Sequence, residues 1–154
     1  MVGPGHLLDV NALLALFWPT HQHHEKVWNW FRADNTRRWA TCPLTQAGFV
    51  RLASNPAMTP DAVSVIEALE LLGANLRHPG HLFWTDDLDL QSALAFCSGR
   101  LQGYRQVTDA YLLGLAIHHK AHLVTLDGGI ASLAPGGARI STRVINPLDK
   151  ATRN

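Results

Sequence analysis

Short apolar runs alternate with longer amphipathic segments along the chain. Residues 6–10 (HLLDV) predict a short buried strand, and the helix-forming residues 11–17 that follow it end before Pro19. Further strands are expected at residues 38–42, 81–84, 122–126 and 144–145. Further helices are expected at residues 21–34, 44–53, 59–72, 88–97 and 108–120. Because strands separated by helices require crossover connections, this order predicts an α/β fold with a mostly parallel central sheet flanked by helices.

The helix expected at 59–72 has a clear apolar face. Pro60 stands early in it, where a proline is tolerated, and Gly73 is a plausible stop. Its apolar stripe consists of Val65, Leu69, Leu72 and Leu76. We therefore expect this stripe to pack against the core.

The composition is typical of a single soluble globular domain. The 154 residues are 47% apolar and 16% charged, which provides enough hydrophobic mass for one core and too little charge for a disordered chain. No apolar run reaches the roughly 18 residues that a membrane span needs, and the first residues lack a secretory signal. Cys42 and Cys97 stand far apart and form neither a disulfide framework nor a zinc pair. We expect a cytoplasmic protein with no membrane partner.

The charged residues add a weak indication of phosphate partners. The net charge of +1 points to neither nucleic acid nor an anionic lipid surface. Ten of the thirteen Lys and Arg residues are Arg, whose planar guanidinium makes two parallel hydrogen bonds to a phosphate. A GC-rich coding sequence favours Arg as well, so this bias by itself decides nothing.

Three aspartates fall where a parallel sheet binds its ligands, beyond the carboxyl ends of the strands. Asp9 closes the first strand, and Asp127 follows the strand expected at 122–126. Asp109 opens the helix expected at 108–120, on the same face as the apolar residues Leu112, Leu113, Ala116 and Ile117. If the amino end of that helix packs at this edge of the sheet, the three carboxylates converge.

Each aspartate also has a purely structural interpretation. Asp9 can cap the helix after it, Asp109 can interact with the positive end of its own helix, and Asp127 can begin an Asp-Gly-Gly turn. Three like charges at one edge, however, raise one another's pKa unless a cation lies among them. Ligation by oxygen alone selects Mg²⁺ or Mn²⁺, and such an ion can activate water and stabilise charge on a phosphodiester. Together the aspartates predict phosphodiester hydrolysis.

Four segments carry a family resemblance. In order and spacing, the chain resembles the PIN-domain ribonucleases, and specifically the VapC-type toxins of bacterial toxin-antitoxin systems, in LLDVNALLALF, CPLTQAGFVRL, TDAYLLGLAI and LVTLDGGIASL. The likeness covers essentially the whole chain. It implies a PIN-like fold over residues 1–148, with 149–154 as a C-terminal tail, and a Mg²⁺- or Mn²⁺-dependent endoribonuclease. It also implies an RNA substrate, neutralisation by a cognate antitoxin, and a homodimer.

The resemblance assigns roles to individual residues. The catalytic, metal-binding acids become Asp9, Asp109 and Asp127. Asn11 and Thr125 become neighbours that hydrogen-bond these acids or the metal-bound waters, and Thr108 flanks the second acid. All of these positions are occupied by the residue types that the chemistry needs.

One expected acid is missing. PIN nucleases usually carry a glutamate in the helix after the second strand, but residues 35–60 contain no Asp or Glu. Gln46 stands nearest to its place, whereas an alignment on Phe49 and Arg51 would put Gly48 there. A glutamine brings no charge, so a second ion should bind more weakly.

Charge from Glu25, Asp86 or Asp87 could compensate for the missing acid. Two outcomes remain open. Either three aspartates hold one ion and support slow hydrolysis, or the domain is a catalytically weakened PIN domain that binds RNA or protein without cutting. The presence of all three aspartates and their polar neighbours favours hydrolysis.

Arg51 and the tryptophans allow more than one interpretation. Arg51 could meet a substrate phosphate or form an ion pair with one of the aspartates, and the sequence leaves both open. In the second expected helix, Trp30 reads as core packing with Val27 and Phe31. Trp28 lies off that stripe and is available for contact with a second subunit or an antitoxin.

Three other functions are not favoured. The histidines at 21–24 and 118–122 do not all face one way, so a zinc site is not expected. The glycines of residues 3–5 precede the first strand and no Walker loop is present, which argues against dinucleotide and kinase sites. A phosphatase of the haloacid-dehalogenase type would need an aspartate where this chain has Asn11.

Overall fold

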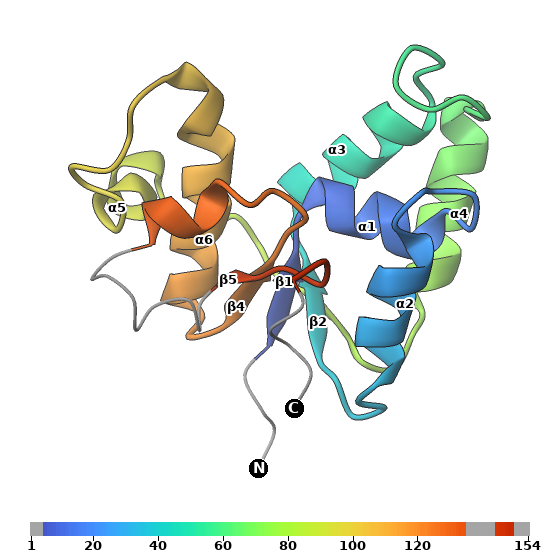
Figure 1. The fold of residues 1–154 in the computed structure, drawn as a ribbon, viewed down its shortest axis with the longest axis horizontal. Helices are drawn as coiled ribbons and strands as arrows, with labels where there is room; N and C mark the ends of the chain where they lie inside the picture. The colour runs from blue at the N-terminus through green and yellow to red at the C-terminus, as the bar shows by residue number, and fades with distance from the viewer. Residues whose placement is uncertain (1–4, 135–143, 150–154) are drawn as a thin grey trace.

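Five parallel strands form one sheet in the computed structural model of the chain, which describes residues 5–134 and 144–149. The strands lie in the order β3-β2-β1-β4-β5 (Figure 1), and each pairs with its neighbours in parallel. Their bounds are β1 His6–Leu8, β2 Trp39–Thr41, β3 His81–Phe83, β4 His122–Val124 and β5 Val144–Ile145. The predicted α/β architecture with a parallel sheet is confirmed.

Helices cover both faces of the sheet (Figure 1). One face carries α1 (Val10–Phe17), α2 (His24–Arg32), α3 (Pro43–Ala53) and α4 (Val65–Leu76). The other carries α5 (Leu90–Ala95) and α6 (Val107–His118). Two short 3₁₀ turns, η1 (Tyr104–Gln106) and η2 (Ile130–Leu133), are the remaining described elements. Neighbouring residues of a strand point to opposite faces, so Leu7 packs in the α5–α6 core and Leu8 in the α1–α4 core.

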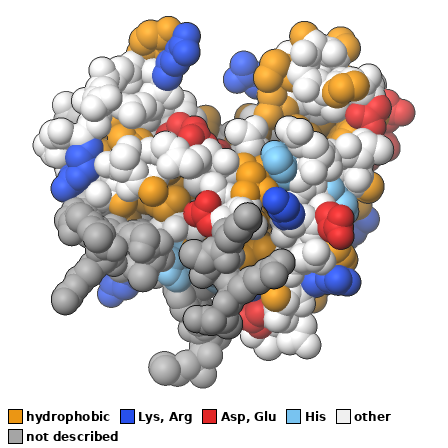
Figure 2. Space-filling view, viewed as in Figure 1, with side chains coloured by type: hydrophobic (Ala, Val, Ile, Leu, Met, Phe, Trp, Pro, Cys, Tyr) orange, Lys and Arg blue, Asp and Glu red, His pale blue; other side chains and the backbone are white. Residues whose placement is uncertain are grey.

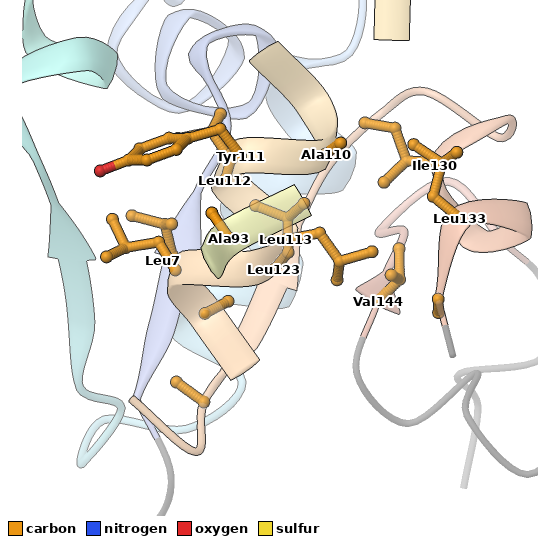
Figure 3. Packing of buried hydrophobic residues seen from close by; sticks show 14 of the residues in the cluster. Leu7, Ala93, Ala110, Tyr111, Leu112, Leu113, Leu123, Ile130, Leu133 and Val144 are labelled. Carbon is orange, nitrogen blue, oxygen red and sulfur yellow. The ribbon is translucent and has the colours of Figure 1, made fainter. Parts of the chain in front are cut away.

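The α5–α6 core is closely packed around a glycine. Leu7 and Leu123 of adjacent strands belong to the same buried cluster as Leu113 of α6 (Figure 3). Gly114 is the point of closest approach between the two helices, because a Cβ atom at this position would overlap the carbonyl oxygen of Ala93 in α5. The backbones of α5 and α6 are therefore in direct contact.

The order of connections places a topological switch between β1 and β4. The connections from β1 to β2 and from β2 to β3 carry α1–α4 on one face, and the connection from β3 back to β4 carries α5 and α6 on the other. Right-handed crossovers that run in opposite directions along a sheet put their helices on opposite faces. In open parallel sheets, ligands bind outside the carboxyl ends of the strands at such a switch.

Helix α4 begins later than the sequence pattern indicated. It starts at Val65 because Ser64 caps it: the Ser64 hydroxyl accepts from the N–H of Glu67, and the Glu67 carboxylate accepts from the N–H of Ser64. Gly73 lies inside the helix rather than after it. The predicted start before Pro60 and the predicted stop were both wrong.

The buried face of α4 also differs from the expected stripe. Ala68 and Leu72 are buried, whereas Val65 and Leu69 are each 53% exposed. The first two positions of the predicted stripe therefore face solvent. On α2 the expectation for Trp28 is met, since this side chain is 43% exposed.

Two further predictions concern the chain as a whole. Within the described residues, no helix has both the length and the apolar character needed to cross a membrane. Of the tail expected at 149–154, residues 150–154 lie outside the described part of the chain. The assignment of a separate tail therefore stays a prediction.

Candidate active site

Asp9 stands at the end of β1, where it is almost fully buried with 6% of its surface exposed. It is the N-cap of α1: its Oδ1 accepts a hydrogen bond from the N–H of Val10 (2.7 Å). Its Oδ2 accepts from the hydroxyl of Thr125 (2.9 Å). The carboxylate is thus held in one orientation by a backbone and a side-chain donor.

Thr125 connects the carboxyl ends of β1 and β4. It is fully buried just after β4, and its hydroxyl donates to Asp9 while accepting from the backbone N–H of Asp127 (3.1 Å). Asp127 is exposed, and its Oδ1 accepts from the N–H of Gly129 (2.8 Å) in a tight turn. The Thr125 hydroxyl therefore holds the Asp9 carboxylate and the backbone of Asp127 in place.

Asp109 approaches this edge from the first turn of α6. Burial, followed by the negative charges of Asp9 and Asp127, raises its pKa to about 6. Burial also raises the pKa of Asp9, the hydrogen bonds from Thr125 and Val10 oppose this rise, and the charge of Asp127 adds to it. The three carboxylates lie close enough for their charges to act on one another, at the topological switch between β1 and β4.

The structural interpretations of the aspartates hold at the same time. Asp9 caps α1, Asp109 stands in the first turn of α6 near its positive end, and Asp127 hydrogen-bonds within its turn. A capping role uses one oxygen of a carboxylate and leaves further lone pairs free. Local roles alone do not account for three acids brought to one place.

The donor chemistry fits a hard divalent cation. The three side chains offer oxygen only, which suits Mg²⁺ or Mn²⁺. In the described ranges the one ion pair joins His119 and Asp87, so no Lys or Arg neutralises the three aspartates. Over the same ranges, no three His, Cys, Asp or Glu side chains already stand as a ready-made metal site. The acids supply the right atoms and uncompensated charge, and would have to draw closer around an ion.

Asn11 and Thr108 have looser positions than Thr125. Asn11 lies exposed in the first turn of α1, and Thr108 lies exposed in the first turn of α6 next to Asp109. The described residues include no hydrogen bond from either side chain to an aspartate. Of the polar neighbours named from the sequence, Thr125 is the one that contacts an acid directly.

The two positions considered for the missing glutamate pack differently in α3. Gly48 has no room for a side chain, because a Cβ there would overlap Val10. Gln46 is half-buried, and its side-chain amide donates to the hydroxyl of Thr41 (3.0 Å), which is in turn hydrogen-bonded to Nε2 of His81 (2.8 Å). The neutral amide of Gln46 is therefore tied to β2.

The acids that could compensate are engaged or distant. Asp87 lies 3.9 Å from His119, beyond the carboxyl end of α6. Asp86 lies beside the Tyr111 hydroxyl, and burial together with this carboxylate raises the pKa of Tyr111 to about 12. Neither these acids nor Glu25 contribute to the raised pKa of Asp109.

Two cavities are lined by residues adjacent in sequence to Asp9 and Asp109, and the sequence had pointed to a candidate substrate-binding residue in one of them. Arg51, exposed on α3, lines a pocket of about 300 Å³ next to Val10, and it has no ion-pair partner among the described residues. A second pocket, of about 230 Å³, lies next to Asp109 and is lined by Leu44, Asp86, Leu90, Val107, Thr108 and Tyr111. Its walls come from three helices and a loop, so no spacing along the sequence could have indicated it.

A third cavity, of about 450 Å³, lies away from the aspartates against the end of α1. Within it the Asp61 carboxylate accepts hydrogen bonds from the Trp18 indole N–H (2.8 Å) and the Thr20 hydroxyl (2.7 Å). These bonds tie the segment before α4 to the end of α1. The polar groups there serve each other, and we assign the cavity a structural role.

Comparison with known proteins identifies the family. The sequence model of the PIN domain matches residues 6–135, most of the chain. The chain belongs to the PIN-domain family. This PIN domain is 48% identical over 128 residues to Ribonuclease VapC38 of Mycobacterium tuberculosis, covering 83% of this chain and 89% of that protein. It is 42% identical over 132 residues to Ribonuclease VapC44 of the same species, covering 86% and 92%. The family resemblance is confirmed.

Solved structures share the fold of this PIN domain. The crystal structure of VapBC2 from Rickettsia felis, bound to a DNA fragment from their promoter, matches with a TM-score of 0.61 and 13% identity, covering 92% of this chain and 97% of that one. PAE2754 from Pyrobaculum aerophilum matches with a TM-score of 0.56 and 22% identity, covering 86% and 81%. The PIN-like fold expected from the sequence is confirmed.

Proposed function

We propose that this PIN domain is an endoribonuclease that hydrolyses RNA phosphodiester bonds with Mg²⁺ or Mn²⁺ held by Asp9, Asp109 and Asp127. The observation that carries the proposal is the convergence at the switch point of three carboxylates that have no cationic partner among the described residues, where the charges of Asp9 and Asp127 act on Asp109. Relatives 48% and 42% identical to the chain are ribonucleases by name, which supports the same reaction class.

The chain's own residues orient and hold the reacting groups. When bound, the metal ion would polarise the phosphate and lower the pKa of a water molecule. Thr125 keeps the Asp9 carboxylate in position, because its hydroxyl donates to Oδ2. Arg51 is free to bind a neighbouring phosphate of the RNA with its guanidinium. Figure 2 shows Lys or Arg side chains on both rims of the hollow between the two halves of the molecule, an arrangement that favours a phosphate backbone.

One ion is held more firmly than a second in this proposal. The helix after β2 offers the amide of Gln46 in place of a carboxylate, and that amide already donates to Thr41. A neutral oxygen ligand adds less affinity for a divalent ion than a charged one. We therefore expect slow, single-ion hydrolysis at ordinary metal concentrations.

The proposal extends to partners and setting. The protein acts in the cytoplasm as a VapC-type toxin, pairs as a homodimer and is neutralised by a cognate antitoxin protein. Similarity in fold to the VapBC2 complex and to FitAB bound to the IR36 DNA fragment is consistent with such a partner. Trp28, 43% exposed on α2, is the large aromatic side chain that we expect an antitoxin or second subunit to cover.

A cleavage assay tests the reaction. Purified protein is incubated with a mixed RNA pool in Mg²⁺, in Mn²⁺ and in EDTA. We expect cleavage that depends on the metal and disappears in Asp9→Asn and Asp109→Asn, while Asp87→Asn, an exposed acid outside the site, cleaves like the parent. Identical traces for parent and Asp109→Asn would reject the enzyme.

The second candidate function is a PIN domain that binds RNA or protein without cutting. The absence of Asp and Glu from residues 35–60 and the lack of a ready-made ligand cluster among the described residues favour it. Calorimetry with Mn²⁺ separates the two. An enzyme binds the ion with measurable heat that Asp109→Asn abolishes, whereas a binding module retains RNA affinity and shows no heat with the metal.

A further inference from the structure

The pocket next to Asp109 has the position of a substrate subsite. Its volume is about 230 Å³, and Thr108, which lines it, directly precedes Asp109 on α6. Leu44, at the start of α3, closes the opposite side. The pocket therefore opens beside the carboxyl edge of the sheet, next to the proposed site of hydrolysis.

The walls of this pocket are apolar and exposed. Leu44 is 39%, Leu90 51% and Val107 38% exposed, and each belongs to a different helix. Three aliphatic side chains line this shallow, open pocket and form an apolar slot on which a flat ring can stack. The volume is below the range of roughly 300–1,000 Å³ that drug-sized ligands occupy, so one ring system fits better than a larger group.

The polar end of the pocket is the Asp86 carboxylate, which lies beside the Tyr111 hydroxyl. Burial together with this carboxylate raises the pKa of Tyr111 to about 12. The Tyr111 hydroxyl stands at the far end of a ring that projects away from the α6 core (Figure 3). Asp86 has no ion-pair partner among the described residues. Two carboxylate oxygens carry about four acceptor sites, so accepting from one hydroxyl leaves both oxygens able to accept again.

We propose that this pocket binds a guanine base of the RNA, stacked between Leu44, Leu90 and Val107, with its N1–H and N2–H donating to the Asp86 carboxylate. Among the four RNA bases, guanine alone presents an imino and an amino N–H side by side, which matches the two oxygens of one carboxylate. Adenine and cytosine offer an amino group next to an acceptor, and uracil offers one imino N–H between two acceptors. The inference rests on the proposed ribonuclease function and names the base that it selects.

A protein surface fits the same pocket less well. An apolar partner surface laid over the three aliphatic residues would bury the Asp86 carboxylate without a counter-charge, which costs free energy. A guanine base instead supplies two N–H donors to that carboxylate. Contact with Thr108 also makes the pocket continuous with the edge that holds Asp109.

Nucleotide binding tests the pocket without any need for catalysis. The full chain in EDTA is titrated with 5′-GMP, AMP, CMP and UMP while the methyl NMR signals of Leu44, Leu90 and Val107 are followed. A bidentate contact corresponds to roughly 10-fold tighter binding of GMP than of the other three. We expect Asp86→Asn to remove this difference and Asp87→Asn, the adjacent acid outside the pocket, to retain it.

Two results would overturn the pocket. Equal binding of all four nucleotides is one, and it would leave the apolar slot without base selectivity. The other is a shift of the same methyl signals on dilution of the protein that GMP does not compete with, because it would mean that a second copy of the chain covers the pocket.

Cleavage of defined RNAs separates this inference from the proposed function. Single-stranded oligonucleotides that differ at one base are cut by the parent, Asp86→Asn and Asp87→Asn. We expect guanine-dependent cleavage, with Asp86→Asn raising KM for the guanine substrate about 10-fold and changing kcat little. Cleavage indifferent to the base would overturn the guanine pocket and leave the ribonuclease intact. Selective GMP binding without cleavage of any RNA would support the pocket and reject the ribonuclease.

Discussion

The two edges of the sheet treat charge in opposite ways. At the amino edge, the Arg37 guanidinium donates to the carbonyl of Trp30 (3.1 Å) and lies 4.2 Å over its ring. Nδ1 of His6 donates to the carbonyl of Arg38 (3.0 Å). Arg37 therefore has backbone and aromatic partners that hold its cationic group in place.

At the carboxyl edge, burial and neighbouring carboxylates raise the pKa of Asp9 and of Asp109, and Asp9, Asp109 and Asp127 have no cationic partner in the described part of the chain. Compensated charge stabilises a fold, whereas uncompensated like charge costs stability and leaves groups ready to bind a ligand. The difference separates an edge built for structure from one built for chemistry. The four predictions that follow test this separation.

Thr125→Val has the largest expected effect. It removes the hydroxyl that donates to Asp9 and accepts from the N–H of Asp127, while keeping the volume of the side chain nearly constant. We expect metal-dependent RNA cleavage to fall about 10- to 100-fold. Steady-state cleavage rates measure the loss. Thr125→Ser keeps the hydroxyl and should retain most of the activity, so equal losses in both variants would contradict the hydrogen-bond explanation.

Arg37→Ala should affect stability and leave cleavage unchanged. It removes the hydrogen bonds to the carbonyls of Trp30 and Phe31 and the cation–π contact. We expect the free energy of unfolding to fall by about 2 kcal/mol, measured by chemical denaturation. Arg37→Lys keeps the charge without the planar group, so its free energy of unfolding should lie between those of the parent and Arg37→Ala. If Arg37→Ala instead lowered the cleavage rate without lowering the free energy of unfolding, the amino edge would not have a purely structural role.

Asp109→Asn should stabilise the metal-free protein. The raised pKa, about 6 against 3.8, means that the folded state holds a proton that the unfolded state has released. Stability is therefore lost as pH rises through this range, and the full cost is present above pH 6. After a discount for partial exposure, we expect the variant to gain about 1–2 kcal/mol at neutral pH in EDTA. Denaturation at pH 4.5, early in this range, should show only about a third of that gain, and an equal gain at both pH values would contradict the charge explanation.

His6→Asn should have the smallest effect, confined to acid. Burial, as the main cause, lowers the pKa of His6, whose unfolded value is 6.5. Its contribution to stability is present above that value and is lost as pH falls through the lowered folded pKa. An Asn amide can replace the Nδ1–H donor to Arg38 without titrating. Denaturation at pH 7.5 and 5.5 should therefore show a smaller acid loss for the variant than for the parent.

Much of the fold could be predicted because buried parallel strands have distinctive sequences. Leu7 and Leu8 form an apolar pair that ends in Asp9, and such a pair is buried on both faces of a sheet. The start of α4 could not be predicted in the same way. Thr59 is buried, and its hydroxyl donates to the carbonyl of Leu52 (2.8 Å), a contact with α3 that no local pattern indicates.

In the candidate site, too, some residues could be predicted from the sequence and others could not. The aspartates could be placed from the sequence because each stands at the end of a strand or the start of a helix. The amide of Gln46 donates to Thr41 of β2, and Arg51 has no carboxylate partner among the described residues. Both facts depend on how α3 packs, which spacing along the chain does not show. The pocket at Asp86 joins residues from helices that share no spacing along the chain.

The close packing at Gly114 fixes the position of α5 relative to α6. Since the backbone of α6 rests on the carbonyl oxygen of Ala93, α5 cannot slide without separating from it. Leu90, on the wall of the pocket, and Asp109, at the sheet edge, are thereby held on one rigid pair of helices. A base seated in the pocket would lie a constant number of nucleotides from the bond that is cut, so these two helices would act as a ruler.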